Sequence, residues 1–189
     1  LPFPSVEFQP LLTEIASQKP DVVFAFFAGG GAVKFVKDYD AAGLKKSIPL
    51  VGSGFLTDGT LEAQGASAQG LITALHYGDN IETPRNTAFR NKFAVTYKVN
   101  PDVYALQGYD AAQMLAIGLA TVKGDLGKKD ALYAAMNKAQ IDSPRGKFTL
   151  SPQRNPTQDF YVREVKGNYN VVTGIAVKAL ADPGRGCKP

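Results

Sequence analysis

The stretch VVFAFFAGGGAVKFV, Val22–Val36, decides the fold because it joins a buried strand to a helix through three glycines. Its apolar run, Val22–Phe27, is long enough for a buried strand and too short for a packed helix. Gly29–Gly31 free the backbone, and apolar residues then recur at helical spacing: Ala32, Val33, Phe35 and Val36. We predict a strand, a glycine loop and a helix start. The loop is either a tight turn without a ligand or a carboxylate or phosphate site at the helix N-terminus.

The same alternation of strand and helix continues on both sides of this stretch. Helices are predicted at 9–18 and from about Gly31 to Ala42, with Gly43 as the C-terminal cap, and short strands at 49–51 and 70–77. Alternating strands and helices are typical of a parallel α/β sheet, in which ligands bind at the carboxyl ends of the strands. Three helices are then predicted, at 84–98 with Thr83 as its N-cap, within 103–122 and at 129–139, and β runs follow near the C-terminus. An α/β segment that is interrupted and resumed indicates two lobes.

Composition narrows the function classes. The chain has 189 residues, of which 44% are hydrophobic and 20% charged, as in an ordinary globular protein. The net charge of +4 is modest and the basic residues are mixed with acidic ones, so we expect no nucleic-acid partner. No apolar run approaches the ~20 residues that span a bilayer. No Cys/His cluster is present, so we expect neither a metal nor a cofactor.

The two ends indicate a piece of a longer chain. The sequence begins LPFPSVEFQP, with neither Met nor an export signal. The one cysteine, Cys187, is either an exposed tail thiol or the partner of a cysteine outside this chain. We therefore expect that an N-terminal part of the protein is missing here.

Candidate site residues combine glycine loops with aromatic side chains. Phe26 and Tyr109 are expected in the core, whereas other aromatics suit either the core or a pocket wall: Phe27, Phe55, Tyr77 and Tyr104. Ser53 and His76, the only histidine, leave a hydrolase as an alternative. The Gly-x-Ser-x-Gly spacing of a nucleophile elbow is absent, however, so we expect no enzyme activity.

The ordered motifs resemble the periplasmic solute-binding proteins of ABC importers, in the branched-chain amino-acid group with the type I, Leu/Ile/Val-binding fold. The stretches that carry the resemblance cover nearly the whole chain in the order of that family, and they are KPDVVFAFFAGGGAVKFVKDYDAAGL (19–44), IPLVGSGF (48–55), GLITALHYGDNIETPRNTAF (70–89), VYALQGYDAAQMLAIGL (103–119) and SPRGKFTLSPQRNPTQDFYVREV (143–165).

The resemblance implies a C-terminal portion of a two-lobed α/β protein that closes on a ligand. Residues 1–77 would belong to the second lobe, 78–157 to the returning part of the first lobe, and 158–189 to the crossing back and a tail. It also implies a periplasmic location, membrane permease subunits of an ABC transporter as partners, and a missing N-terminal half.

The resemblance further implies which residues face the ligand. In amino-acid binders, an aromatic residue and an acid hold the ligand, and the matching positions here are Ala28 and Gly54. We therefore expect an aromatic carboxylate, with Phe55, Tyr77 and Tyr104 on its ring and His76 or Gln107 near a ring hydroxyl. The expected ligand-binding set is Phe27, Ala28, Gly29, Gly30, Ser53, Phe55, His76, Tyr77, Tyr104 and Gln107. An amino-acid binder, or a ligand-sensing domain of a receptor or regulator, are the alternatives.

Overall fold

The computed structural model of the protein describes residues 7–186, which fall into two compact units. The first unit comprises residues up to Asn80 together with Tyr161–Gly174, and the second comprises Ile81–Phe160 together with residues from Ile175 onward. The predictions about Cys187 and about the first residues of the chain lie outside the described residues.

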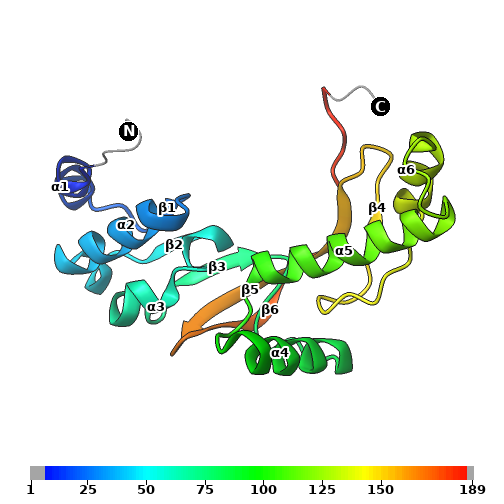
Figure 1. The fold of residues 1–189 in the computed structure, drawn as a ribbon. Coiled ribbons are helices and arrows are strands. Elements are labelled where there is room, and N and C mark those ends of the chain that lie inside the picture. The colour runs from blue at the N-terminus through cyan, green and yellow to red at the C-terminus, as the bar shows by residue number, and fades with distance from the viewer. Residues whose placement is uncertain (1–6, 187–189) are drawn as a thin grey trace. The chain divides into compact units, whose positions relative to one another are not determined.

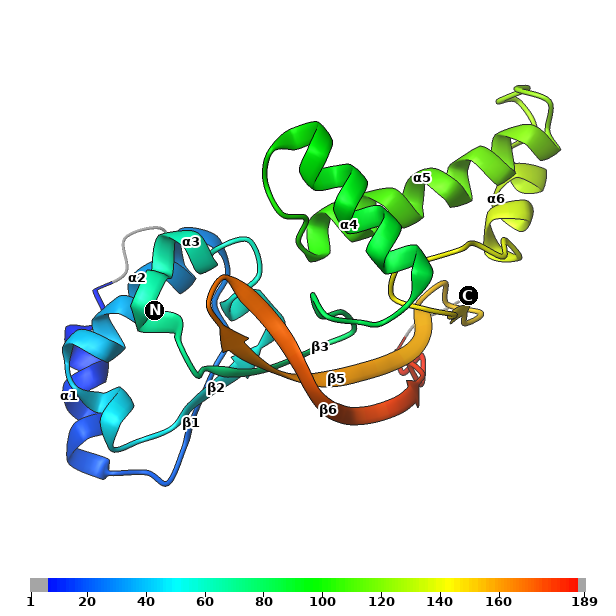
Figure 2. The same ribbon diagram turned by 90° about the horizontal axis from the view of Figure 1, so that it is seen from below.

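The first unit is a parallel sheet extended by an antiparallel strand (Figures 1 and 2). Strands β1 (Val23–Ala25), β2 (Leu50–Ser53) and β3 (Ile72–Leu75) are parallel neighbours in that order. Strand β5 (Pro156–Lys166) pairs antiparallel with β3 and places Arg163 opposite Thr73. The helices of this unit are α1 (Gln9–Gln18), α2 (Gly29–Ala41) and α3 (Leu61–Gln64). The predicted parallel α/β arrangement is confirmed.

Helix α2 begins two residues earlier than predicted, because the glycines form its first turn instead of a loop. Ala28 is the extended N-cap residue, and its carbonyl accepts a hydrogen bond from the amide of Ala32 at 3.4 Å. The predicted stop is confirmed: Gly43 has φ 74° and its amide donates to the carbonyl of Asp40 at 2.9 Å.

The second unit contains three helices and part of a β-ribbon. Helices α4 (Pro84–Tyr97), α5 (Val103–Thr121) and α6 (Lys129–Asn137) lie close to the predicted ranges. Thr83 caps α4 as predicted, because its hydroxyl accepts a hydrogen bond from the amide of Asn86 at 3.0 Å. Strand β4 (Thr149–Leu150) pairs antiparallel with β5, which also pairs with β6 (Tyr169–Leu180). The two long strands β5 and β6 carry the chain between the units.

The core of the first unit lies on the α1 and α2 side of the sheet. Its fully buried side chains include Phe8, Leu12, Phe35, Tyr39 and Leu56. The opposite face of β1 is open, since Phe24 and Phe26 are 70% and 63% exposed. The expectation that Phe26 lies in the core is therefore wrong, because the strand is buried on one face only. Tyr109 is half-buried and packs on Phe89, with 5.1 Å between ring centroids.

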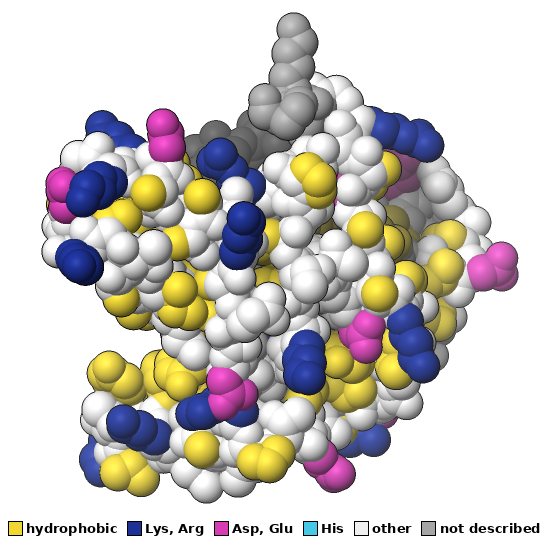
Figure 3. Space-filling model, turned by 90° about the vertical axis from the view of Figure 1, so that its right-hand side faces the viewer, with side chains coloured by type: hydrophobic (Ala, Val, Ile, Leu, Met, Phe, Trp, Pro, Cys, Tyr) yellow, Lys and Arg dark blue, Asp and Glu magenta, His cyan; other side chains and the backbone are white. Residues whose placement is uncertain are grey.

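The surface carries no single dominant charge on the face drawn in Figure 3. Lys and Arg side chains there are separated by acidic and uncharged ones, with hydrophobic side chains exposed between them (Figure 3). Among the described residues, no helix combines the length and the apolar character needed to cross a bilayer.

The close packing of Gly52 in β2 generates a stability prediction. A Cβ at this position would lie 2.7 Å from both the carbonyl oxygen of Ala25 and the Cδ2 of Leu56. We expect Gly52→Ala to lower the free energy of unfolding by about 1–3 kcal/mol, because the strand and the turn after it must move apart.

Gly31→Ala is the matched control, because its Cβ would meet only Phe27 at 4.0 Å and would sit in a helix. It should raise stability by up to about 1 kcal/mol. Urea unfolding of both variants checks the pair, and a neutral Gly52→Ala would contradict the packing.

Candidate functional site

Three chain segments meet at one edge of the first unit because β1, β2 and β3 are parallel. The segment after β1 contains Phe27–Gly30, the segment at the end of β2 contains Ser53–Phe55, and His76 and Tyr77 directly follow β3. Parallel neighbours end at the same edge of a sheet. The fold therefore brings eight of the ten predicted residues to one edge of this unit.

The first segment offers backbone N–H groups to the solvent. Gly29 and Gly30 open helix α2, are exposed, and would have open space around an added Cβ. The N-cap residue Ala28 supplies no side-chain hydrogen bond to the first turn. Phe27 differs from these residues, because its ring packs on Phe8 and Phe35 with centroids 5.1 and 4.8 Å away. The glycines thus form an open helix N-terminus, while Phe27 supports it from the core.

The second segment adds a hydroxyl and an aromatic ring. The Oγ of Ser53 is buried and has no hydrogen-bond partner among the described residues. The ring of Phe55 is half-buried and lies edge-on to Phe26, with centroids 6.1 Å apart. A buried hydroxyl without a partner favours a polar group that arrives from outside the unit.

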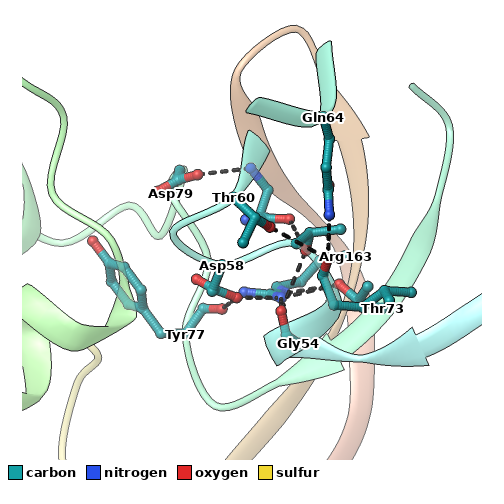
Figure 4. Close-up of polar contacts among 11 residues, drawn as sticks. Gly54, Asp58, Thr60, Gln64, Thr73, Tyr77, Asp79 and Arg163 are labelled. Carbon is teal, nitrogen blue, oxygen red and sulfur yellow. Dashed lines mark hydrogen bonds and ion pairs between the residues drawn. The ribbon is translucent and has the colours of Figure 1, made fainter. Parts of the chain in front are cut away.

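His76 and Tyr77 are more buried than we expected for ligand-binding residues at the end of a strand. His76 is 8% exposed and Tyr77 is 1% exposed. The backbone carbonyl of Tyr77 accepts a hydrogen bond from Nη1 of Arg163 at 2.9 Å, while its ring points away from that guanidinium (Figure 4). The side chain of Tyr77 is thus buried within the described residues, and its ligand contact stays a prediction.

The remaining two predicted residues lie in the second unit. Tyr104 is 45% exposed and Gln107 is exposed, one turn apart on α5. Gln107 also lines a cavity of about 410 Å³ whose other walls include Met114, Tyr133 and Phe148. These two residues therefore stand on a different compact unit from the other eight.

Sequence reasoning missed the polar centre under the sheet edge. Arg163 on β5 is fully buried, and its Nη2 lies 2.7 Å from Oδ2 of Asp58, which is 3% exposed. Its Nε and Nη2 donate to the hydroxyl of Thr73 at 3.2 and 3.0 Å, and Nη2 also donates to the carbonyl of Gly54 at 3.3 Å (Figure 4). The signal was a cation at an inward position of the alternating run DFYVREV, which requires a buried acid as partner.

A second buried ion pair lies in the second unit. Nη2 of Arg145 is 3.0 Å from Oδ2 of Asp110, which also accepts the Ser143 hydroxyl at 2.8 Å. The guanidinium covers the ring of Phe148 at 4.1 Å and donates to Gln158 at 2.6 Å. Burial raises the pKa of Asp110 above its ordinary value, while Ser143 and Arg145 act in the opposite direction. Burial likewise lowers the pKa of Arg145, opposed by Asp110.

Comparisons with known proteins identify the family that this sequence matches. Residues 1–170 match the model of the family described as "Periplasmic binding protein". The Leu/Ile/Val-binding protein homolog 6 of Brucella melitensis is 32% identical over 171 residues, which are 87% of this chain and 44% of that protein. The chain therefore spans less than half the length of this curated relative.

Solved structures of solute-binding proteins have the same fold as this chain. A solute-binding protein of an ABC transporter from R. palustris, in complex with benzoate, has 52% identity and a TM-score of 0.95 over 100% of this chain and 52% of its own. A second, from Rhodopseudomonas palustris BisB5 with 3,4-dihydroxybenzoic acid, has 30% identity and a TM-score of 0.85 over 95% of this chain and 51% of its own. A leucine-binding protein from Thermotoga maritima, 17% identical over 95% of this chain and 49% of its own with a TM-score of 0.72, shares the fold. The predicted type I fold, present as about half of such a chain, is confirmed.

The two ion pairs of Asp110 and Asp142 allow a matched test of burial. Asp142 pairs with Arg85 on the surface, whereas the Asp110 side chain is 3% exposed. Asp110→Ala should cost about 3–5 kcal/mol of unfolding free energy, because it leaves the charge of Arg145 buried without its acid. Asp142→Ala should cost under about 1 kcal/mol, because water replaces the lost partner. Chemical denaturation of both variants measures the difference, and equal costs would refute the contrast.

Proposed function

Because the chain belongs to the periplasmic binding protein family, we propose that it forms part of a solute-binding protein that delivers aromatic carboxylates to an ABC importer. The observation that carries this proposal is the 52% identity to a benzoate-bound protein across the whole chain. In this proposal, residues 1–77 belong to the second lobe, 78–157 to the first lobe, and 158–189 cross back and form a tail. The lobe boundaries 77/78 and 157/158 are those of the sequence prediction.

The chemistry of the sheet edge supports an anionic aromatic ligand. The N-terminus of α2 presents unpaired N–H groups and the positive end of the helix dipole, both of which favour a carboxylate. Ser53 adds a hydroxyl with no partner among the described residues. Phe55 supplies an apolar surface for a ring, and ligand contacts of Tyr104 and Gln107 remain part of the proposal.

An amino-acid ligand is the second candidate, because the curated relatives are named Leu/Ile/Val-binding homologs. An α-ammonium needs an acid partner when it is buried. At Gly54 a Cβ would lie 2.6 Å from Cβ of Leu75 and 2.7 Å from Nη2 of Arg163, so this position has no space for an acidic side chain. This packing favours a ligand without an ammonium group.

Three further proposals depend on the importer function. A periplasmic location, permease subunits as partners and an N-terminal half that completes the first lobe all belong to the importer function. A hydrolase is not favoured, because Ser53 Oγ makes no hydrogen bond to His76 in the described residues. A sensing domain of a receptor would have the same cleft, and the sequence that precedes this chain in its gene distinguishes the two.

Calorimetric titration of the protein with both lobes complete tests the ligand class. Benzoate and 4-hydroxybenzoate should bind with one site per molecule, and leucine should give no heat of binding. Cyclohexane carboxylate is the control for the ring, since it keeps the carboxylate and removes aromaticity. Leucine binding without benzoate binding would overturn the proposal in favour of an amino-acid importer.

Ser53→Ala tests the role of the buried hydroxyl. We expect the affinity for benzoate to fall by about tenfold to a hundredfold, since a hydrogen bond to a charged carboxylate contributes about 1.5–3 kcal/mol. Ser47→Ala is the control, because Ser47 precedes β2 at the opposite end of the strand and bonds only the carbonyl of Leu44 at 3.3 Å. Equal affinities of wild type and Ser53→Ala would remove Ser53 from the site.

A further inference from the structure

The guanidinium of Arg163 connects the two chain segments that follow β2 and β3. It donates from Nη2 to the carbonyl of Gly54 at 3.3 Å and from Nη1 to the carbonyl of Tyr77 at 2.9 Å. Gly54 directly follows β2, and Tyr77 lies two residues beyond the end of β3. One side chain from β5 therefore bonds to the backbone of both segments at once (Figure 4).

The segment after β2 is tied to this guanidinium by a closed set of bonds. The carbonyl of Gly54 also accepts the amides of Thr57 and Asp58, both at 3.0 Å. The carboxylate of Asp58 forms an ion pair with the same guanidinium, with 2.7 Å between Oδ2 and Nη2 of Arg163. Residues 54–58 thus form a turn that is bonded to Arg163 at its beginning and at its end.

The segment after β3 is fixed by packing as well as by its bond to Arg163. A Cβ on Gly78 would lie 2.4 Å from Cγ2 of Val172 and 3.5 Å from Cδ of Arg163. The amide of Asp79 donates to the carbonyl of Asn170 at 2.9 Å, and the Asn170 side chain accepts the Thr57 hydroxyl at 2.6 Å. A second set of contacts therefore links the two segments beside the guanidinium.

We propose that Arg163 is the positioning residue of the ligand-binding edge: it holds Ser53–Phe55 and His76–Tyr77 in one fixed relative geometry without touching the ligand. This inference rests on the proposed function for the identity of that edge. The charge of Arg163 is paired with Asp58, and its Nη2 already donates to Gly54 and Thr73, so a ligand carboxylate is left to the N–H groups of α2 and to Ser53.

Arg163→Lys is the first test, because lysine keeps the charge beside Asp58 and cannot bridge two carbonyls with a planar fork. Hydrogen exchange of the ligand-free protein reads the positioning directly. The amides of Thr57, Asp58 and Asp79 should exchange at least about tenfold faster in the variant, all three together, because both segments lose the same anchor. Exchange at the wild-type rate would overturn the proposal.

Thr73→Val and Thr73→Ser keep the test decisive if Arg163→Lys does not fold. The valine variant removes the hydroxyl that accepts from Nε and Nη2, and the serine variant retains it. Tyr39→Phe is the matched control, since it also removes one buried hydroxyl of this unit, the donor to the carbonyl of Ile48 at 3.1 Å. Only Thr73→Val should speed exchange at the three amides, and Thr73→Ser should behave as wild type.

Calorimetric titration with benzoate then separates positioning from stability. Arg163→Lys and Thr73→Val should weaken binding by about tenfold or more, while Tyr39→Phe keeps the wild-type affinity at a comparable loss of stability. Faster exchange with unchanged benzoate affinity would overturn the positioning role. If the wild-type protein itself binds no aromatic carboxylate, the proposed ligand fails, and the exchange rates alone decide whether Arg163 couples the two segments.

Discussion

The buried ion pair of Arg163 and Asp58 is the constraint on which the first unit depends. A fully buried guanidinium is tolerated only beside an acid and with its donors satisfied, so Asp58 must stay within bonding distance of β5. Asp58 lies in the turn after β2, and Thr73 lies on β3. The pair therefore fixes β5, which comes late in the chain, against strands that come early, and it does so at the edge where the strands end.

Local patterns in the sequence were sufficient for the elements themselves. The helix at 9–18 has its predicted bounds, and the cap at Thr83 and the stop at Gly43 follow from side-chain and backbone preferences that act within four residues. The order of strands and helices then determined the sheet. The error at Phe26 has a different origin, because whether a strand is covered on one face or on two depends on distant segments.

The position of the candidate site could be predicted from the sequence, but the contacts that hold its segments in place could not. The carboxyl ends of parallel strands identify the edge, and the glycines of α2 mark its open N-terminus. The contact between Arg163 and Gly54 joins residues 109 positions apart, and no periodicity in a single sequence reports such a pair. The bond from Arg163 to the carbonyl of Tyr77 is likewise a tertiary contact, since β5 supplies a neighbour that the run GLITALHY does not reveal.

The polar centre formed by Arg163, Asp58 and Thr73 also limits which side chains the edge can present to a ligand. Glycine at position 54 lets the guanidinium approach the backbone, and the guanidinium in turn removes the space that a side chain at 54 would need. An edge built this way carries no acidic side chain at position 54 for an ammonium group, while Asp58 pairs with the buried Arg163 beneath it. In the proposed function, recognition of a carboxylate would rely on the N–H groups of α2, the hydroxyl of Ser53 and the helix dipole. Neutral donors of this kind would suit the proposed task, because a protein that captures a solute must also release it to a membrane permease.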